Sequence, residues 1–165
     1  MSGEGEGKVA VLPGSFDPPH VGHLDLIERS RLLFDRLYVA VLDNESKQPL
    51  FPVAERIAML EELTATWDDC VVESFSGLLV EYARSRGAIA VIRGLRSVTD
   101  FDYELPMTRM NRHLAPGVDT LYLLATADHS SLSSSLIKEV ARLGGDVSGL
   151  VPPVVLARLR AALRP

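Results

Sequence analysis

The stretch KVAVLPGSFDPPHVGH, from Lys8 to His23, decides the fold. Its first part, Lys8 to Leu12, is short, apolar and closed by Pro13-Gly14, which is typical of a buried strand. The residues from Gly14 onward form a loop that leads into a helix beginning at about His20 to His23. Backbone N–H groups and the positive end of the helix dipole attract phosphate at such a helix start. The stretch therefore predicts a strand, a phosphate-binding loop and a helix, in that order.

Four further apolar runs follow along the chain. They are Leu37 to Leu42, Cys70 to Phe75, Ala88 to Ile92, and Thr120 to Ala125. Between them lie segments with the period of an amphipathic helix, as in Val53 to Thr66 and Gly77 to Arg86. Strands and helices that alternate in this way form βαβ units with right-handed connections. We therefore expect an α/β, Rossmann-like, doubly wound fold, with a parallel five-stranded sheet buried on both faces by helices.

Length and composition favour one domain. With 165 residues, of which 47% are hydrophobic, the chain can bury a single large core. We expect residues 1–7, rich in Gly and Glu, to form a disordered leader and residues 8–165 to form the domain. The run from Val151 to Arg164 has two prolines near its start and predicts a terminal helix, which packs either on the sheet or on a neighbouring subunit.

Charge and cysteine content argue against several classes of protein. The formal charge of −5 provides no positive field for DNA or RNA, so we expect no nucleic-acid partner and a local cation cluster for any anionic ligand. Cys70 is the single cysteine, which rules out an internal disulfide and fits a reducing compartment. No apolar stretch approaches the ~20 residues that span a bilayer, and residues 1–7 lack the features of a signal peptide. We expect no membrane association and a cytoplasmic location.

Ligands of a doubly wound sheet bind beyond the carboxyl ends of its strands. After the first strand, His20 and His23 are three positions apart and share a helical face, so both can reach an anion at the helix start. Two other interpretations are open for these histidines: surface or capping residues, and a zinc site formed with Asp17. After the second strand, Lys47 is the single cation of a polar loop. After the third, Leu78-Leu79 are either core or substrate contacts.

The fourth strand is followed by Arg93 and Arg96, which flank Gly94. Guanidinium groups bind phosphate oxygens with fixed geometry, which favours an anion site. The alternative is a pair of surface arginines that bridge to Asp100 or Asp102. After the fifth strand, Ser133 to Ser135 begin a helix, where their hydroxyls either act as plain caps or bind phosphate together with a nearby lysine.

These motifs resemble those of a known family. The string PGSFDPPHVGH contains a form of the (H/T)xGH signature of the nucleotidyltransferase superfamily, and SSSLIK resembles that superfamily's (I/V)SS(S/T)xx(K/R) motif. The block IRGLRSVTDFDYE, from Ile92 to Glu104, is similar to one that distinguishes the phosphopantetheine adenylyltransferases of coenzyme A synthesis. Three departures stand out. Ser15 and His20 each replace a commoner Thr, and Asp128 to Leu132 lacks the aromatic residue found there in many relatives.

The resemblance implies an enzyme that transfers the adenylyl group of ATP to 4′-phosphopantetheine, giving dephospho-CoA and pyrophosphate. The reaction is direct in-line attack without a covalent intermediate, and Mg²⁺ bridges the ATP phosphates. It also implies a homohexamer and feedback binding of CoA. Two alternatives stay open: a related nucleotidyltransferase that uses nicotinate mononucleotide or glycerol 3-phosphate, and a non-catalytic CoA or nucleotide sensor.

The resemblance also implies roles for individual residues, and none of them is a metal ligand. The expected catalytic residues are His23, Ser15, Lys47 and Arg93, with His23 stabilising the transition state and Arg93 binding the acceptor phosphate. The expected ATP contacts are Ser15, Phe16, His20, His23, Gly94, Arg96, Glu104, Ser130, Ser133, Ser134 and Ser135. The expected phosphopantetheine contacts are Ser15, Lys47, Leu79, Arg93, Met110 and Asn111.

Overall fold

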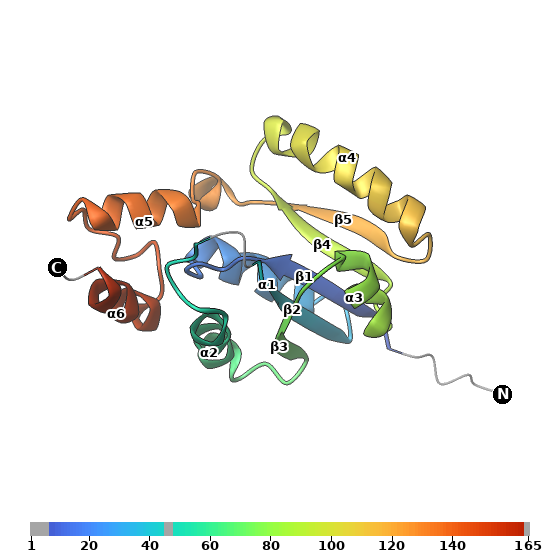
Figure 1. Ribbon diagram of the computed structural model, residues 1–165, viewed down its shortest axis with the longest axis horizontal. Helices are drawn as coiled ribbons and strands as arrows, with labels where there is room; N and C mark the ends of the chain where they lie inside the picture. The colour runs from blue at the N-terminus through green and yellow to red at the C-terminus, as the bar shows by residue number, and fades with distance from the viewer. Residues whose placement is uncertain (1–6, 45–47, 164–165) are drawn as a thin grey trace.

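The computed structural model describes residues 7–44 and 48–163. All but one residue of the predicted leader, and the predicted catalytic Lys47, lie outside the described residues. The elements, shown in Figure 1, are β1 (Val9–Gly14), α1 (Val21–Arg31), β2 (Arg36–Leu42), α2 (Val53–Thr64), β3 (Cys70–Phe75), α3 (Leu79–Ser85), β4 (Ala90–Leu95), α4 (Val98–Leu114), β5 (Asp119–Leu124), η1 (Ala127–His129), α5 (Ser134–Arg142) and α6 (Pro153–Ala162).

The five strands form one parallel sheet in the order β3-β2-β1-β4-β5. This is a doubly wound arrangement, so the predicted fold class is confirmed. The order in which strands are added to the sheet reverses between β1 and β4, which pair in parallel through only Ala10 with Ala90 and Val11 with Val91. Beyond that pair both strands continue without a common ladder. Their carboxyl ends therefore part and open the crevice in which ligands of such sheets bind.

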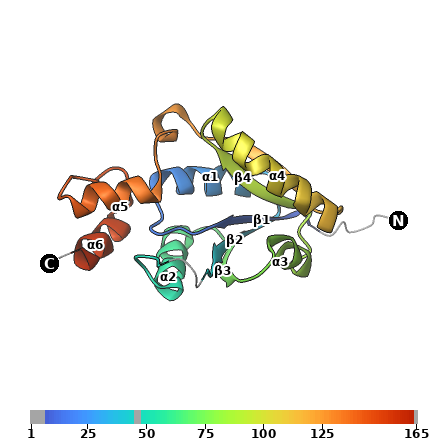
Figure 2. The same cartoon turned by 45° about the horizontal axis from the view of Figure 1, so that its top comes forward.

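Helices cover both faces of the sheet. On one face, α1 and α2 pack on β1, β2 and β4 around buried residues such as Leu12, Ile27 and Leu60. On the other face, α3 packs on the sheet around Val80 and Ala83. A third apolar cluster lies away from the sheet and joins α2, α5 and α6, and both views show these helices together at one end of the molecule (Figures 1 and 2).

The terminal helix differs from one of the two expectations for it. Val155 and Leu159 of α6 are buried in the third cluster with Met59 of α2 and Ile137 of α5. Within the chain, the helix thus packs not on the sheet but on α2 and on α5, the helix that carries the serine motif. In the part of the chain that the structure describes, no helix is both long and apolar enough to cross a membrane.

Two strand predictions need correction. The fourth strand runs from Ala90 to Leu95 and not from Ala88 to Ile92, because its ladder with β5 continues through Arg93 and Gly94 despite the charge. Burial on both faces holds for the central strands but not for the edge strand β5, where Leu124 is 69% exposed. An edge strand has a neighbour on one side only, so an apolar sequence does not guarantee burial there.

Candidate active site

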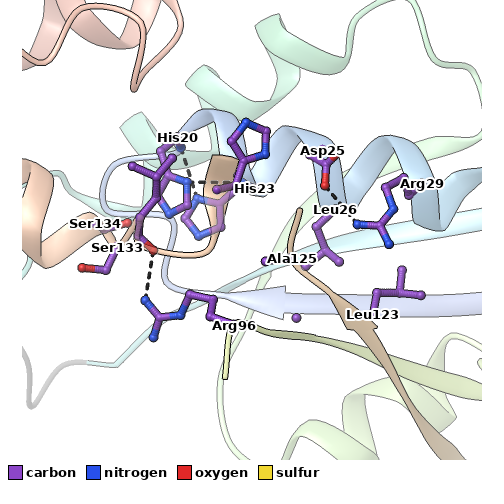
Figure 3. A pocket seen from close by; sticks show the side chains of 14 residues that line it. His20, His23, Asp25, Leu26, Arg29, Arg96, Leu123, Ala125, Ser133 and Ser134 are labelled. Atoms are coloured by element: carbon purple, nitrogen blue, oxygen red, sulfur yellow. Dashed lines mark hydrogen bonds and ion pairs between the residues drawn. The ribbon is translucent and has the colours of Figure 1, made fainter. Parts of the chain in front are cut away.

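The first cavity lies at the carboxyl end of the sheet, on the face covered by α1. Its volume is about 260 Å³. The residues that line it are His20, Gly22, His23, Asp25, Leu26, Arg29, Gly94, Arg96, Leu123, Ala125, His129, Leu132, Ser133 and Ser134. Figure 3 shows the two imidazoles of α1 on one side of this cavity, with Arg96 and the serines of α5 across from them. The structure therefore brings together the histidine, arginine and serine motifs.

His20 and His23 form a reciprocal cap at the start of α1. The backbone N–H of His20 donates to Nδ1 of His23 at 3.1 Å, and the N–H of His23 donates to Nδ1 of His20 at 3.3 Å. Their rings stack with centroids 3.6 Å apart. Because each Nδ1 accepts a hydrogen bond, the neutral form of each ring carries its proton on Nε2. The capping interpretation is thus correct for both residues, and it leaves each Nε2–H as a donor.

Both histidines are held in the neutral state. Burial lowers the pKa of His20 to about 4, with smaller effects from the nearby Arg96 and His129. Burial also lowers the pKa of His23 well below its usual range, helped by His20 and Arg96. The ring of Phe16 packs edge-on against His23 with centroids 4.9 Å apart. At neutral pH the helix start therefore offers uncharged N–H donors and no imidazolium.

Arg96 crosses from the end of β4 to the start of α5. Its Nη1 donates to the carbonyl of Leu132 at 3.0 Å, and its Nε lies 3.1 Å from a carboxylate oxygen of Asp100. The alternative prediction of a bridge to Asp100 is therefore correct for this arginine, and the residue still lines the first cavity. Ser133 caps α5 by accepting a hydrogen bond from the N–H of Leu136 at 3.1 Å.

The second cavity lies on the opposite face of the sheet. Its volume is about 150 Å³, and it is lined by Leu79, Val91, Arg93, Tyr103, Glu104, Met107, Thr108, Asn111 and Thr120. Arg93 makes a two-point ion pair with Glu104, with Nε and Nη2 at 2.8 and 2.6 Å from the two carboxylate oxygens. Glu104, expected at the ATP site, thus lies with the residues expected to contact phosphopantetheine. Glu104 belongs to α4, which packs against β4 and β5 on the side of the sheet that Arg93 faces.

Gly94 marks the boundary between these two cavities. A Cβ at this position would lie 3.0 Å from Cδ2 of Leu26, on the α1 side of the sheet. The absence of a side chain therefore permits α1 to approach β4 closely, and Gly94 lines the first cavity while its neighbour Arg93 lines the second.

A third cavity lies between the loop after β1 and the start of α5. It is about 170 Å³ in volume and is lined by Ser15, Asp17, Leu42, Asn44, Gln48, Pro49, Arg56, Ser134, Ser135 and Lys138. Ser134 lines this cavity and the first one. The serine motif therefore connects two hollows along the helix start, as an extended polyphosphate would require.

Among the described residues, three predicted site residues line none of these cavities. The side chain of Phe16 is 1% exposed, because a φ of 49° turns its ring back into the core. Met110 is 53% exposed on α4, and Ser130 is exposed in the loop before α5.

The alternative of a zinc site formed by Asp17, His20 and His23 is not supported. Asp17 bonds to Leu50, Phe51 and Lys138, and the described residues contain no group of three His, Cys, Asp or Glu side chains suited to a metal.

Several cavity residues were missed from the sequence. Leu26 and Arg29 lie one and two turns beyond Gly22 on α1, so continuing the helical period from the histidine motif would have found them. Arg56 of α2 donates to the carbonyls of Ser15, Leu42 and Phe51 at 2.8 to 3.1 Å. A single arginine within a helical pattern has no local signal for such a role.

Comparison with known proteins agrees with this geometry. The model of the cytidylyltransferase-like family matches residues 11–140. The match covers the sheet, the crevice and the histidine and serine motifs, and it identifies the class as a nucleotidyltransferase with a Rossmann-like domain.

Two curated relatives are similar over nearly the whole chain. A phosphopantetheine adenylyltransferase of Alkaliphilus metalliredigens is 49% identical over 149 residues, which are 90% of this chain and 95% of the relative. One of Geotalea daltonii is 48% identical over 154 residues, which are 93% of this chain and 96% of the relative. The chain belongs to the phosphopantetheine adenylyltransferase family.

Proposed function

We propose that this protein transfers the adenylyl group of ATP to 4′-phosphopantetheine, with release of pyrophosphate and formation of dephospho-CoA. The observation that carries the proposal is the separation of the arginine block. Arg96 faces a cavity with the histidine and serine motifs, whereas Arg93 faces a cavity with Leu79 and Asn111. Two anionic substrates can thus be held on two sides of the crevice between β1 and β4, with their phosphates meeting at its edge.

The first cavity suits ATP. Neutral His20 and His23 present Nε2–H donors, and the start of α5 adds hydroxyl and backbone donors along a line into the third cavity. His23 is our choice for the group that stabilises charge on the α-phosphate in the transition state. A fixed neutral donor can do so without a change of protonation.

The second cavity suits the acceptor. A phosphate monoester has a second pKa near ~6, so it is already charged at neutral pH and needs no general base. Positioning and charge stabilisation are therefore sufficient for direct in-line attack, without a covalent intermediate. Arg93 and Lys47 are the proposed ligands of the acceptor phosphate, and Ser15 orients the reacting phosphates.

Mg²⁺ is proposed to enter with ATP. It binds preferentially through phosphate oxygens and water, so the hydroxyl-rich start of α5 fits it without a carboxylate cluster. When bound, Mg²⁺ neutralises part of the charge of the triphosphate.

We further propose a cytoplasmic homohexamer that binds CoA as a feedback ligand. Exposed apolar side chains on α4 and β5, among them Met107 and Leu121, support assembly through this face.

The test is to measure pyrophosphate release from ATP and Mg²⁺ with 4′-phosphopantetheine, nicotinate mononucleotide or glycerol 3-phosphate, with products identified by mass. We expect release with phosphopantetheine alone, yielding dephospho-CoA. Release with another acceptor only would overturn the substrate assignment and retain the nucleotidyltransferase class. No release of pyrophosphate with any of the three acceptors would favour a non-catalytic sensor.

A further inference from the structure

Asp17 is a buried carboxylate that contacts three separate segments. Its residue is 5% exposed. The backbone N–H groups of Leu50 and Phe51 each donate to it at 2.9 Å, and Nζ of Lys138 lies 2.8 Å from Oδ2. One side chain of the loop after β1 thus holds the chain just before α2 and also holds α5.

Lys138 lies one helical turn after Ser134 on α5, so the two side chains share a face. Ser134 donates its hydroxyl to the carbonyl of Pro18 at 2.8 Å, next to the pair formed by Lys138 and Asp17. The start of α5 is therefore attached to the loop after β1 at two adjacent points. The side chain of Lys138 is only 17% exposed, and its ammonium group contacts Asp17.

The negative charge of Asp17 is balanced by its neighbour Lys138. Burial by itself raises the pKa of Asp17, but the hydrogen bond from Lys138 and those from Leu50 and Phe51 outweigh it, and the pKa is lowered. Asp17 is therefore ionised at neutral pH and uses the charge of Lys138 as its counterion. A lysine that moved away from Asp17 toward an ATP phosphate would leave a buried carboxylate without its counterion, which is costly.

We infer that Asp17 and Lys138 form a positioning pair that aligns the two substrate sites, and that Lys138 acts through Asp17 and not as a ligand of ATP. The inference rests on the proposed function. Lys138 fixes the serines of α5 for the phosphates of ATP. Asp17 attaches the loop after β1, two residues beyond Ser15, to the Leu50–Phe51 segment. Loss of the pair disturbs both substrates together, whereas loss of an ATP ligand disturbs one.

A double-mutant cycle tests this assignment. The variants are Lys138→Met, Asp17→Asn and their combination, with Arg142→Met as the matched control, since Arg142 is an exposed cation on the same helix. For each we would measure kcat/KM for both substrates, each with the other substrate saturating, and the Kd of ATP by calorimetry. We expect Lys138→Met to lower kcat/KM for ATP and for phosphopantetheine by a similar factor, roughly tenfold to hundredfold. Arg142→Met should change neither.

The combination decides between the two roles. We expect Lys138→Met to change the Kd of ATP by less than about twofold once Asp17 is already Asn, because coupled residues are not additive. The inference would be overturned if the losses of kcat/KM in the two single variants multiplied in the combined variant. A rise in the KM of ATP alone would also overturn it. If Asp17→Asn does not fold, the comparison of the two substrates in Lys138→Met decides alone. The calorimetric arm needs no acceptor, so failure of the proposed substrate would be distinguishable from failure of the positioning pair.

Discussion

Arg93 and Arg96 are three residues apart, yet they face different cavities and keep different partners. Arg93 belongs to β4 and donates two hydrogen bonds to Glu104 of α4. Arg96 follows the strand, pairs with Asp100 within one turn, and reaches the carbonyl of Leu132 at the start of α5. A short block at the end of a central strand can therefore supply cations to two substrates on opposite faces of one sheet. Substitutions on each side of the sheet test that division.

The largest effect is expected at His23, which lies on the ATP side of the division. We expect His23→Ala to lower kcat by about 100- to 1000-fold, because a fixed donor to the developing charge is lost. Binding of both substrates, measured by calorimetry, should change by less than about threefold. His113→Ala, an exposed histidine near the end of α4, is the control and should behave as the wild type. Equal losses in binding and in kcat would assign His23 to substrate binding and remove it from the reacting centre.

The second prediction concerns His20, which lines the first cavity and should make the stability of the protein depend on pH. His20 has its pKa lowered from 6.5 to about 4 in the folded state, so the unfolded chain takes up a proton first as the pH falls. Its contribution to the free energy of unfolding is present above pH 6.5 and is lost as the pH falls through the folded pKa, by about 3 kcal/mol in total. Denaturant unfolding from pH 7.5 to 4 measures this loss.

The matched variant for this pH experiment is His20→Thr. Threonine can still cap α1 but does not titrate. The variant should lose stability less steeply than the wild type between pH 6.5 and 4. Parallel curves for the two proteins would contradict a neutral, buried His20.

A smaller effect distinguishes the two arginine partners. Glu104 holds Arg93 with two short hydrogen bonds in a half-buried place, whereas Asp100 and Arg96 form a more exposed pair. We expect Glu104→Gln to cost about 1 kcal/mol of unfolding free energy and Asp100→Asn less than that. Glu104→Gln should also raise the KM of phosphopantetheine severalfold and leave that of ATP unchanged. A rise in the KM of ATP instead would return Glu104 to the ATP site, where the sequence motif placed it.

The sequence predicted the sheet, its class and the place of the site, because apolar runs followed by polar or glycine-containing loops are typical of buried strands and their ends. It predicted less well where a side chain points. Glu104 faces Arg93 because α4 carries it to that side of the sheet, 11 residues along the chain. Phe16 turns into the core because its backbone has a left-handed φ. Neither direction is visible in the local sequence pattern. The β4 boundary was misplaced at Ile92, since a charged residue within a ladder carries no strand signal.

Buried polar contacts were the hardest feature to foresee. Asp17, Arg56 and Lys138 are separated by 39 to 121 positions, and their roles come from carbonyl, N–H and ion-pair contacts that exist only in the folded chain. A motif identified Lys138 as a candidate for phosphate binding but could not name its partner.

The most direct test of the account is a crossed measurement of KM for ATP and for phosphopantetheine in Arg93→Met and Arg96→Met. A hydrogen bond to a charged group contributes about 1.5–3 kcal/mol, so each variant should raise one KM by roughly tenfold or more. We expect Arg93→Met to raise the KM of phosphopantetheine and Arg96→Met to raise that of ATP, while the KM of the other substrate changes by less than about twofold. A similar rise in both constants for either variant would contradict the assignment of one cavity to each substrate.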